Sequence, residues 1–133
     1  MNAVLRALLL GCCLAMLPMP RALAQAELDF TAAKSAADAD EASLDAATGA
    51  AVLAQQRAFL DARVAACANI RTTARLEDFV VVVELDADGL VARTWRRGDS
   101  PLALCIERDA RGKAMFVPPR APFHASLEVG FTP

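Results

Sequence analysis

The segment Phe79-Val80-Val81-Val82-Val83-Glu84-Leu85 is followed by Asp86-Ala87-Asp88-Gly89 and then by Leu90-Val91-Ala92-Arg93-Thr94-Trp95. β-Branched valine favours extended backbone, and an unbroken apolar run predicts a strand that is covered on both faces. Aspartate favours turns, and Gly89 can supply the positive φ of a four-residue hairpin loop with a bulge. The stretch therefore predicts a β-hairpin.

The loop Asp86–Gly89 also resembles half of a calcium-binding loop. In that register the twelfth position, which supplies a bidentate carboxylate, would be Trp95, and an indole cannot coordinate calcium. The hairpin interpretation is therefore favoured, and we expect neither a metal nor a cofactor.

Three arginines surround the only tryptophan of the chain, on the second strand of the hairpin. Alternation predicts that Val91, Arg93 and Trp95 share one side. Tryptophan and arginine dominate the energetics of protein interfaces, so we interpret this region as a candidate partner-binding patch, formed by Arg93, Trp95, Arg96 and Arg97. The alternative is a solvated sheet face on which the tryptophan covers the core.

Ser100-Pro101 predicts the start of a short helix, because serine caps helices and proline fits their first position. In this helix Leu102, Cys105 and Ile106 are expected to face inward, and Glu107, Arg108 and Arg111 outward. Gly112 should end it. Pro118-Pro119 and Pro122 then predict an irregular, extended corner.

The last strand has the clearest alternation, with Phe123, Ala125, Leu127, Val129 and Phe131 on one face and His124, Ser126 and Glu128 on the other. Serine, histidine and glutamate suggest a catalytic triad, but neighbours on one face of a strand lie about 7 Å apart. A triad needs hydrogen-bonded side chains, so we expect a polar outer face and no catalysis. A sideways bond from His124 to an adjacent strand is left open.

Leu53, Leu60, Val64 and Cys67, with Val52 and Phe59 beside them, predict an amphipathic helix of about four to five turns. The preceding residues, 25–51, are rich in alanine and acids but poor in large apolar side chains. We expect them to form a frayed helix or a flexible leader, broken at Thr48-Gly49.

Residues 1–24 have the features of a cleavable signal peptide, with a basic start, an apolar run and Ala22-Leu23-Ala24 before the cut. The alternative is a lipoprotein, in which Leu9-Leu10-Gly11-Cys12 is a lipobox and Cys12 carries the lipid. Cleavage before Gln25 removes two arginines and no acid, which takes the formal net charge from −2 to −4. Such a chain lacks the basic balance of nucleic-acid-binding proteins.

Cys67 and Cys105 are the cysteines that remain after cleavage. An even count in an exported chain predicts a disulfide. The alternative, a reactive or metal-binding pair of thiols, is not supported by any C-x-x-C motif.

The order of Phe79–Leu85, Asp88-Gly89-Leu90-Val91, the Pro101 helix, Phe116-Val117-Pro118-Pro119 and the final strand resembles the C-terminal domain of TonB-like periplasmic proteins. The resemblance covers about half of the mature chain. It implies a three-stranded antiparallel sheet with a helix packed on one face, and binding of an extended peptide at an open sheet edge.

We therefore predict an α+β protein in which residues 25–51 form the leader and 52–133 a disulfide-linked domain. The expected function is non-catalytic binding of a protein or peptide in the periplasm or outside the cell, at the arginine patch or at the edge offered by Phe123, Ser126 and the rest of the last strand. The alternatives are an envelope assembly factor, oligomeric through Val80 and Val82, and, less favoured, a redox or hydrolytic enzyme.

Overall fold

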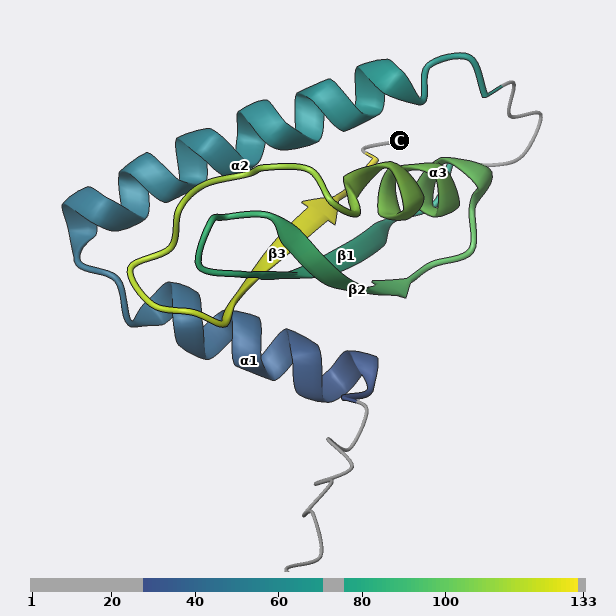
Figure 1. Cartoon of the computed structure of the whole chain (residues 1–133). Coiled ribbons are helices and arrows are strands. Elements are labelled where there is room, and N and C mark those ends of the chain that lie inside the picture. Colours follow the sequence, from purple (N-terminus) through teal and green to yellow (C-terminus); the bar gives the residue numbers. More distant parts are fainter. Residues whose placement is uncertain (1–27, 71–75, 132–133) are drawn as a thin grey trace, which may run out of the picture.

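The computed structural model describes residues 28–70 and 76–131. The signal peptide predicted over 1–24, its cleavage site and the alternative lipid site at Cys12 lie outside the described residues. The elements are α1 (Phe30–Ala42), α2 (Ala46–Ala66), β1 (Phe79–Leu85), β2 (Val91–Arg97), α3 (Pro101–Ala110) and β3 (Phe123–Val129) (Figure 1).

The three strands form one antiparallel sheet in the order β2-β1-β3, so the valine-rich β1 is central. The loop before β2 is held by Asp86, whose Oδ1 accepts hydrogen bonds from the backbone N–H of Asp88 at 3.0 Å and of Leu90 at 2.9 Å. Gly89 has a φ of 81°, and a register shift between Glu84 and Leu85 marks the bulge. The predicted α+β class and β-hairpin are confirmed.

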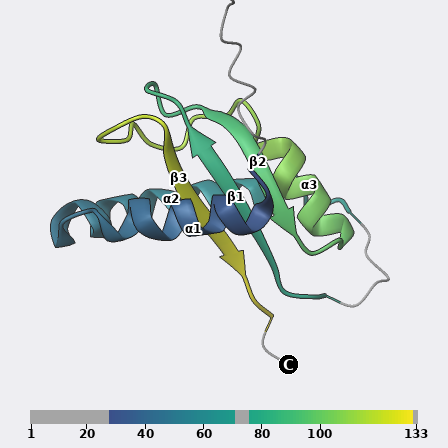
Figure 2. The same ribbon diagram turned by 90° about the horizontal axis from the view of Figure 1, so that it is seen from below.

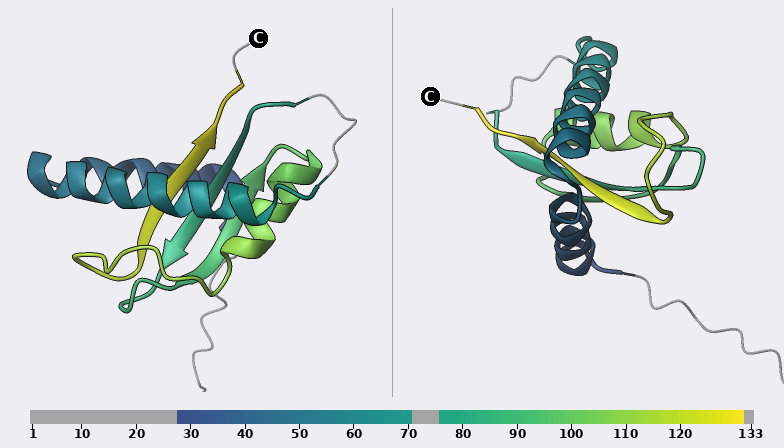
Figure 3. Two further views of the ribbon diagram at one scale, coloured as in Figure 1. Left: turned by 90° about the horizontal axis from the view of Figure 1, so that it is seen from above. Right: turned by 90° about the vertical axis from the view of Figure 1, so that its left-hand side faces the viewer.

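Helices cover both faces of the sheet. Figure 3 shows α2 and α3 on one side and α1 on the other, and Figure 2 shows α1 running across the strands. Alternate residues of β1 therefore enter two apolar clusters: Val81, Val83 and Leu85 pack towards α2 and α3, while Val82 packs towards α1. The prediction that Phe79–Leu85 is covered on both faces is confirmed.

The expectation of a frayed or flexible leader is wrong for Phe30–Ala42, which forms α1 and packs on the sheet. Ala33 and Ala37 are fully buried against Val82, because their small side chains let the helix approach the strands closely. The sequence analysis required large apolar side chains for packing, and alanine at a four-residue spacing supplies a contact without them.

The break between α1 and α2 lies at Ser43–Asp45, not at Thr48-Gly49. Asp45 caps α2 by accepting hydrogen bonds from the backbone N–H of Ala47 and Thr48, both at 3.0 Å. Gly49 lies within the first turns of α2. An aspartate in extended conformation therefore sets this boundary, as N-capping preferences allow.

The long helix is confirmed as α2, but its buried face is rotated by about one residue from the predicted one. Val52 and Phe59 are buried, whereas Leu53 is 48% and Val64 38% exposed. The residues of α2 and its C-cap that face the core are Val52, Phe59 and Cys67, which are seven and eight residues apart.

α3 begins as predicted, with Ser100 Oγ accepting a hydrogen bond from the backbone N–H of Ala103 at 3.2 Å. The structure joins Cys67, at the end of α2, to Cys105 of α3, with their Cα atoms 6.0 Å apart, within the range of disulfides. The predicted disulfide is confirmed. None of the helices within the described residues is both long and apolar enough to span a membrane.

Candidate functional site

The outer edge of β3 was expected to be uncovered, and the structure shows that acidic side chains of α1 occupy it. The backbone N–H of His124 donates to Asp40 Oδ2 at 2.8 Å, and that of Ser126 donates to Glu41 Oε1 at 2.9 Å. The two carboxylates accept these bonds where the carbonyl groups of a neighbouring strand would. The edge that was considered for peptide binding is therefore protected by α1 at these positions.

Phe123 and Ser126 are consequently not available to a partner in this conformation. Phe123 is fully buried and its ring contacts that of Phe116 edge-on, with centroids 5.7 Å apart. Ser126 lies beneath α1, with its backbone N–H already bonded.

The opposite edge, along β2, is open over Thr94–Arg96. The N–H groups of His124 and Ser126 point away from β1, so Val81 and Val83 bond β3 and Val82 bonds Trp95. The backbone groups of Thr94 and Arg96 therefore point away from the sheet. Within residues 28–70 and 76–131, neither of these two N–H groups has a hydrogen-bond partner. Nearer the start of β2 the edge is closed, since Val91 N–H donates to the carbonyl of Lys113 at 2.9 Å.

The four residues predicted to form one patch on the hairpin divide between the two faces of the sheet. Arg93, Trp95 and Arg97 lie on the α1 face, whereas Arg96 lies on the α3 face. Val91 also lies on the α3 side, not with Arg93 as predicted, because the bulge at the start of β2 interrupts the alternation.

Trp95 is partly buried and packs against the apolar cluster between α1 and the sheet. Its Nε1–H donates to the carbonyl of Leu28 at 2.6 Å, and its ring lies 5.8 Å from that of His124. The position of Trp95 therefore agrees with the alternative given in the sequence analysis, in which the tryptophan covers the core.

Arg93 and Arg97 flank the open edge on the α1 face. Arg93 bonds Glu84 through two nitrogens, at 3.1 and 2.5 Å, and lies over the Trp95 ring. Arg97 lies over the Phe30 ring at 4.9 Å, and no carboxylate pairs with it among the described residues. Its charge is therefore available to an acidic ligand.

On the α3 face a network of polar side chains follows the same edge. Glu107, which was expected to face out, is largely buried and accepts from Arg96 at 3.0 Å, from Thr94 at 3.1 Å and from Arg111 at 3.1 Å. Asp99 is the main reason that the pKa of Arg96 is raised; burial opposes this shift, and Glu107 adds to it. Arg96 is thus a charged and firmly held member of the edge.

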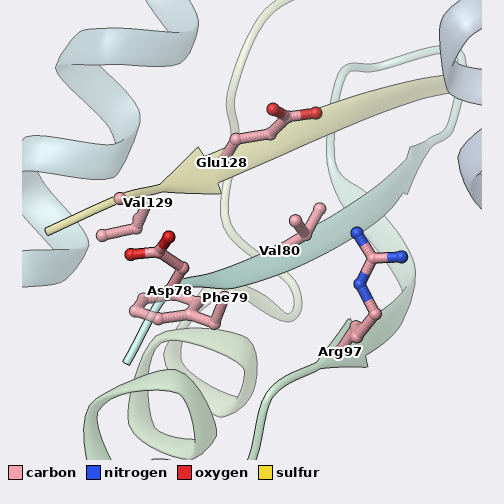
Figure 4. A pocket seen from close by; sticks show the side chains of 7 residues that line it. Asp78, Phe79, Val80, Arg97, Glu128 and Val129 are labelled. Atoms are coloured by element: carbon pink, nitrogen blue, oxygen red, sulfur yellow. The ribbon is translucent and has the colours of Figure 1, made fainter. Parts of the chain in front are cut away.

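A pocket of about 300 Å³ lies at the end of the sheet where β1 begins and β2 and β3 end (Figure 4), lined by Asp78, Phe79, Val80, Arg97, Glu128, Val129 and Gly130. Two of its carboxylates have partners within the protein: Glu128 pairs with Lys34 at 3.1 Å, and Asp78 accepts from the backbone N–H of Phe131 at 2.8 Å. Arg97 is the cation among the residues that line the pocket.

His124 lies at the centre of a second polar group, between α1 and the sheet. Its ring Nδ1 is 3.1 Å from Asp40 Oδ2, and its Nε2 is 3.2 Å from Glu84 Oε2. The ring therefore approaches Glu84 of the adjacent strand, but Nε2 makes no hydrogen bond there. The predicted polar outer face, however, is covered: His124 is only 7% exposed.

This arrangement does not form a catalytic triad. A triad requires the second ring nitrogen to contact a nucleophile, and here it faces a carboxylate. Ser126 Oγ is buried without a hydrogen-bond partner. Among the described residues no group of three histidine, cysteine or acidic side chains has the arrangement to hold a metal ion.

Asp40 connects this group to the surface. Burial acts to raise the pKa of the Asp40 carboxyl, but hydrogen bonds from His124 and Arg120 outweigh it and hold the pKa below its ordinary value. Arg120, in the corner before β3, pairs with the outer oxygen of this carboxylate. No family model, curated protein or solved structure matches this chain.

Sequence reasoning did not identify Asp40 and Glu41 as important residues. They lie more than 80 residues before the backbone groups that they bind, and no motif connects segments that far apart. The one available indication was that two adjacent acids occur in a stretch otherwise suited to a tightly packed helix.

Proposed function

We propose that this protein binds an extended segment of a partner by strand addition at the open edge of β2. The observation that carries the proposal is the pair of unpartnered backbone N–H groups of Thr94 and Arg96. An added strand satisfies such groups through main-chain hydrogen bonds, while side chains on each side give specificity.

The charges around this edge favour an acidic partner. Arg93 and Arg97 flank one face of β2, and Arg96 and Arg111 flank the other. Pairing of two β2 edges from two copies would bring these arginines together, and like charges directly opposite one another destabilise a sheet. Charged edges of this kind discourage self-association but leave the edge usable by a segment of opposite charge.

The proposed site differs from the two surfaces considered in the sequence analysis. β3 is capped by α1, and Val82, which was considered for oligomer formation, is fully buried beneath α1. An assembly factor that associates through Val80 and Val82 would have to displace this helix first.

We propose a non-catalytic role in the periplasm or outside the cell. The signal-peptide features of residues 1–24 support export, and a disulfide is typical of oxidising compartments. The TonB-like order of the second half of the chain supports peptide recognition at a sheet edge. The contact of His124 with carboxylates on both sides supports a structural role for this residue.

The proposal can be tested with a synthetic peptide of about seven residues that alternates valine and glutamate, added to the oxidised mature protein. Binding should shift the amide NMR signals of Thr94 and Arg96 most strongly. Thr94→Pro removes an outward-pointing N–H without removing a bond to β1 and should abolish binding. Thr94→Val, which keeps the N–H, should bind normally.

Charge provides the second arm of the experiment. Arg97→Glu should weaken binding of the acidic peptide at least about tenfold, whereas Arg57→Glu on the exposed side of α2 should have little effect. Arg96 is a poor choice for reversal, because its contacts with Glu107 and Asp99 hold the α3 side together. Amide shifts confined to β3, or equal affinity for a basic peptide, would refute the proposed site.

A further inference from the structure

We infer that His124 is a proton-dependent latch that fastens α1 to the sheet and thereby controls access to the edge of β3. This inference concerns a different edge from the proposed peptide site on β2. It rests on the position of the imidazole between a carboxylate of α1 and a carboxylate of β1.

Counting hydrogen-bond donors shows why the latch depends on a proton. The ring Nδ1 lies 3.1 Å from an oxygen of Asp40, and Nε2 lies 3.2 Å from an oxygen of Glu84, which is an ion-pair distance without hydrogen-bond alignment. A neutral imidazole carries one N–H, and only the imidazolium carries two. In the neutral form, one buried carboxylate therefore faces a ring lone pair, which is unfavourable where water is excluded.

The other charged groups around the ring do not replace the second proton. Arg120, from the corner before β3, is 53% exposed and pairs with the outer oxygen of Asp40. Arg93, from β2, bonds both oxygens of Glu84 from the rim of the sheet. These two arginines balance the charge of the carboxylates, but neither lies between α1 and β1, whereas the His124 ring lies between Asp40 and Glu84.

The remaining groups on this face hold α1 at its two ends. Lys34 of α1 pairs with Glu128 of β3 at 3.1 Å in solvent. Glu41 of α1 accepts from the backbone of Ser126 and from Gln56 Nε2 of α2, at 2.7 Å in the latter case. Carboxylates, lysines and arginines as residue types keep their charge near neutral pH, where an imidazole can exchange a proton.

The disulfide does not include α1. It joins α2 to α3, whereas α1 is linked to α2 through the turn at Ser43–Asp45 and the Gln56–Glu41 hydrogen bond. The apolar contact of α1 with the sheet is made by Ala33, Ala37 and Phe30. Loss of the latch therefore frees the backbone N–H groups of His124 and Ser126, which can then donate hydrogen bonds to an added strand.

The experiment uses the oxidised mature protein and benefits from His124 being the only histidine of the chain. Imidazole ¹⁵N signals report the number of ring protons, and hydrogen exchange reports protection factors corrected for the intrinsic pH dependence of the rate. Between pH 5 and pH 8.5, we expect protection of α1, His124 and Ser126 to fall about tenfold or more. The protection of α2 and α3 should stay constant.

Two variants separate the latch from general effects of pH. His124→Gln cannot titrate and should remove the change in α1 protection over this range. Ser126→Ala, on the same face of β3, should retain it. If His124→Gln does not fold, Glu84→Gln provides the same test, because it removes one of the two carboxylates and should shrink the change.

The inference is overturned by any of three results. The first is a ring that carries a single proton throughout the range. The second is constant protection of α1 while the ring loses a proton. The third is a pH-dependent loss that persists in His124→Gln.

Discussion

The carboxylate of Asp40 contacts His124 twice: its Oδ2 accepts the backbone N–H at 2.8 Å and lies 3.1 Å from the ring Nδ1. One side chain of α1 thus closes a position on the edge of β3 and holds the imidazole that lies on the face of the same strand. Loss of this contact should disturb both the edge and the face.

Asp40→Asn should lower the free energy of unfolding by about 1 to 3 kcal/mol, because it removes the charged acceptor of buried donors. The folded-state pKa of Asp40 lies below its ordinary value. Its contribution to stability is therefore complete above the unfolded-state pKa of about 3.9 and is lost as the pH falls through the folded-state pKa. Urea denaturation between pH 6 and pH 2 should show a shallower acid loss in the variant. Asp61→Asn on the exposed side of α2 is the control, and an equal effect there would contradict the prediction.

Cys105→Ser should lower the free energy of unfolding by about 2 to 5 kcal/mol under oxidising conditions, because the bond closes a long loop between residues 38 apart in sequence. Adding a reductant to the wild-type protein should lower its stability to that of the variant, and the reductant should leave the variant unchanged. Titration of two free thiols in the native wild-type protein would show that the bond is absent.

Gly89→Ala and Gly112→Ala form a matched pair at positive φ, 81° and 73°. A Cβ at Gly89 would lie 2.3 Å from the carbonyl oxygen of Phe116, whereas nothing lies within 4 Å of one at Gly112. Both changes incur the backbone cost of about 1 kcal/mol, but only Gly89→Ala must also displace the segment before Pro118. Thermal denaturation should show a clearly larger loss for Gly89→Ala, and equal losses would contradict the packing argument.

Ala37→Leu should loosen α1, because overpacking a filled contact costs about 1 to 3 kcal/mol and Ala37 is fully buried on the sheet. Trp95 lies in the same cluster and is the only tryptophan of the chain. A red shift of its fluorescence should therefore accompany the change. Ala39→Leu, at an exposed position of α1, should leave the emission where it is in the wild type.

Elements with local sequence features were predicted well, and contacts between distant segments were not. The hairpin at Gly89, the helix start at Ser100 and the alternation of β3 each depend on neighbouring residues. The pairing of Cys67 with Cys105 followed from the cysteine count and the expected export of the chain, without any geometric information.

The errors have physical causes at particular residues. The packing of α1 on the sheet was not predicted, because Ala33 and Ala37 form its buried face. A helix that packs through alanine has the same amino-acid composition as a helix exposed to solvent. The buried face of α2 was misplaced because Val52 and Leu53, and likewise Phe59 and Leu60, are adjacent and both apolar. Periodicity alone does not decide which member of each pair is buried.

The capping of His124 and Ser126 by Asp40 and Glu41 makes α1 a tethered competitor of any strand that approaches β3. A segment linked by a short turn has an effective concentration in the millimolar range or above. A partner in solution at micromolar concentration must therefore bind this edge much more tightly than α1 does, whereas no segment within residues 28–70 and 76–131 competes in this way for Thr94 and Arg96 of β2. The two edges of one small sheet should consequently differ in occupancy even for partners of similar intrinsic affinity.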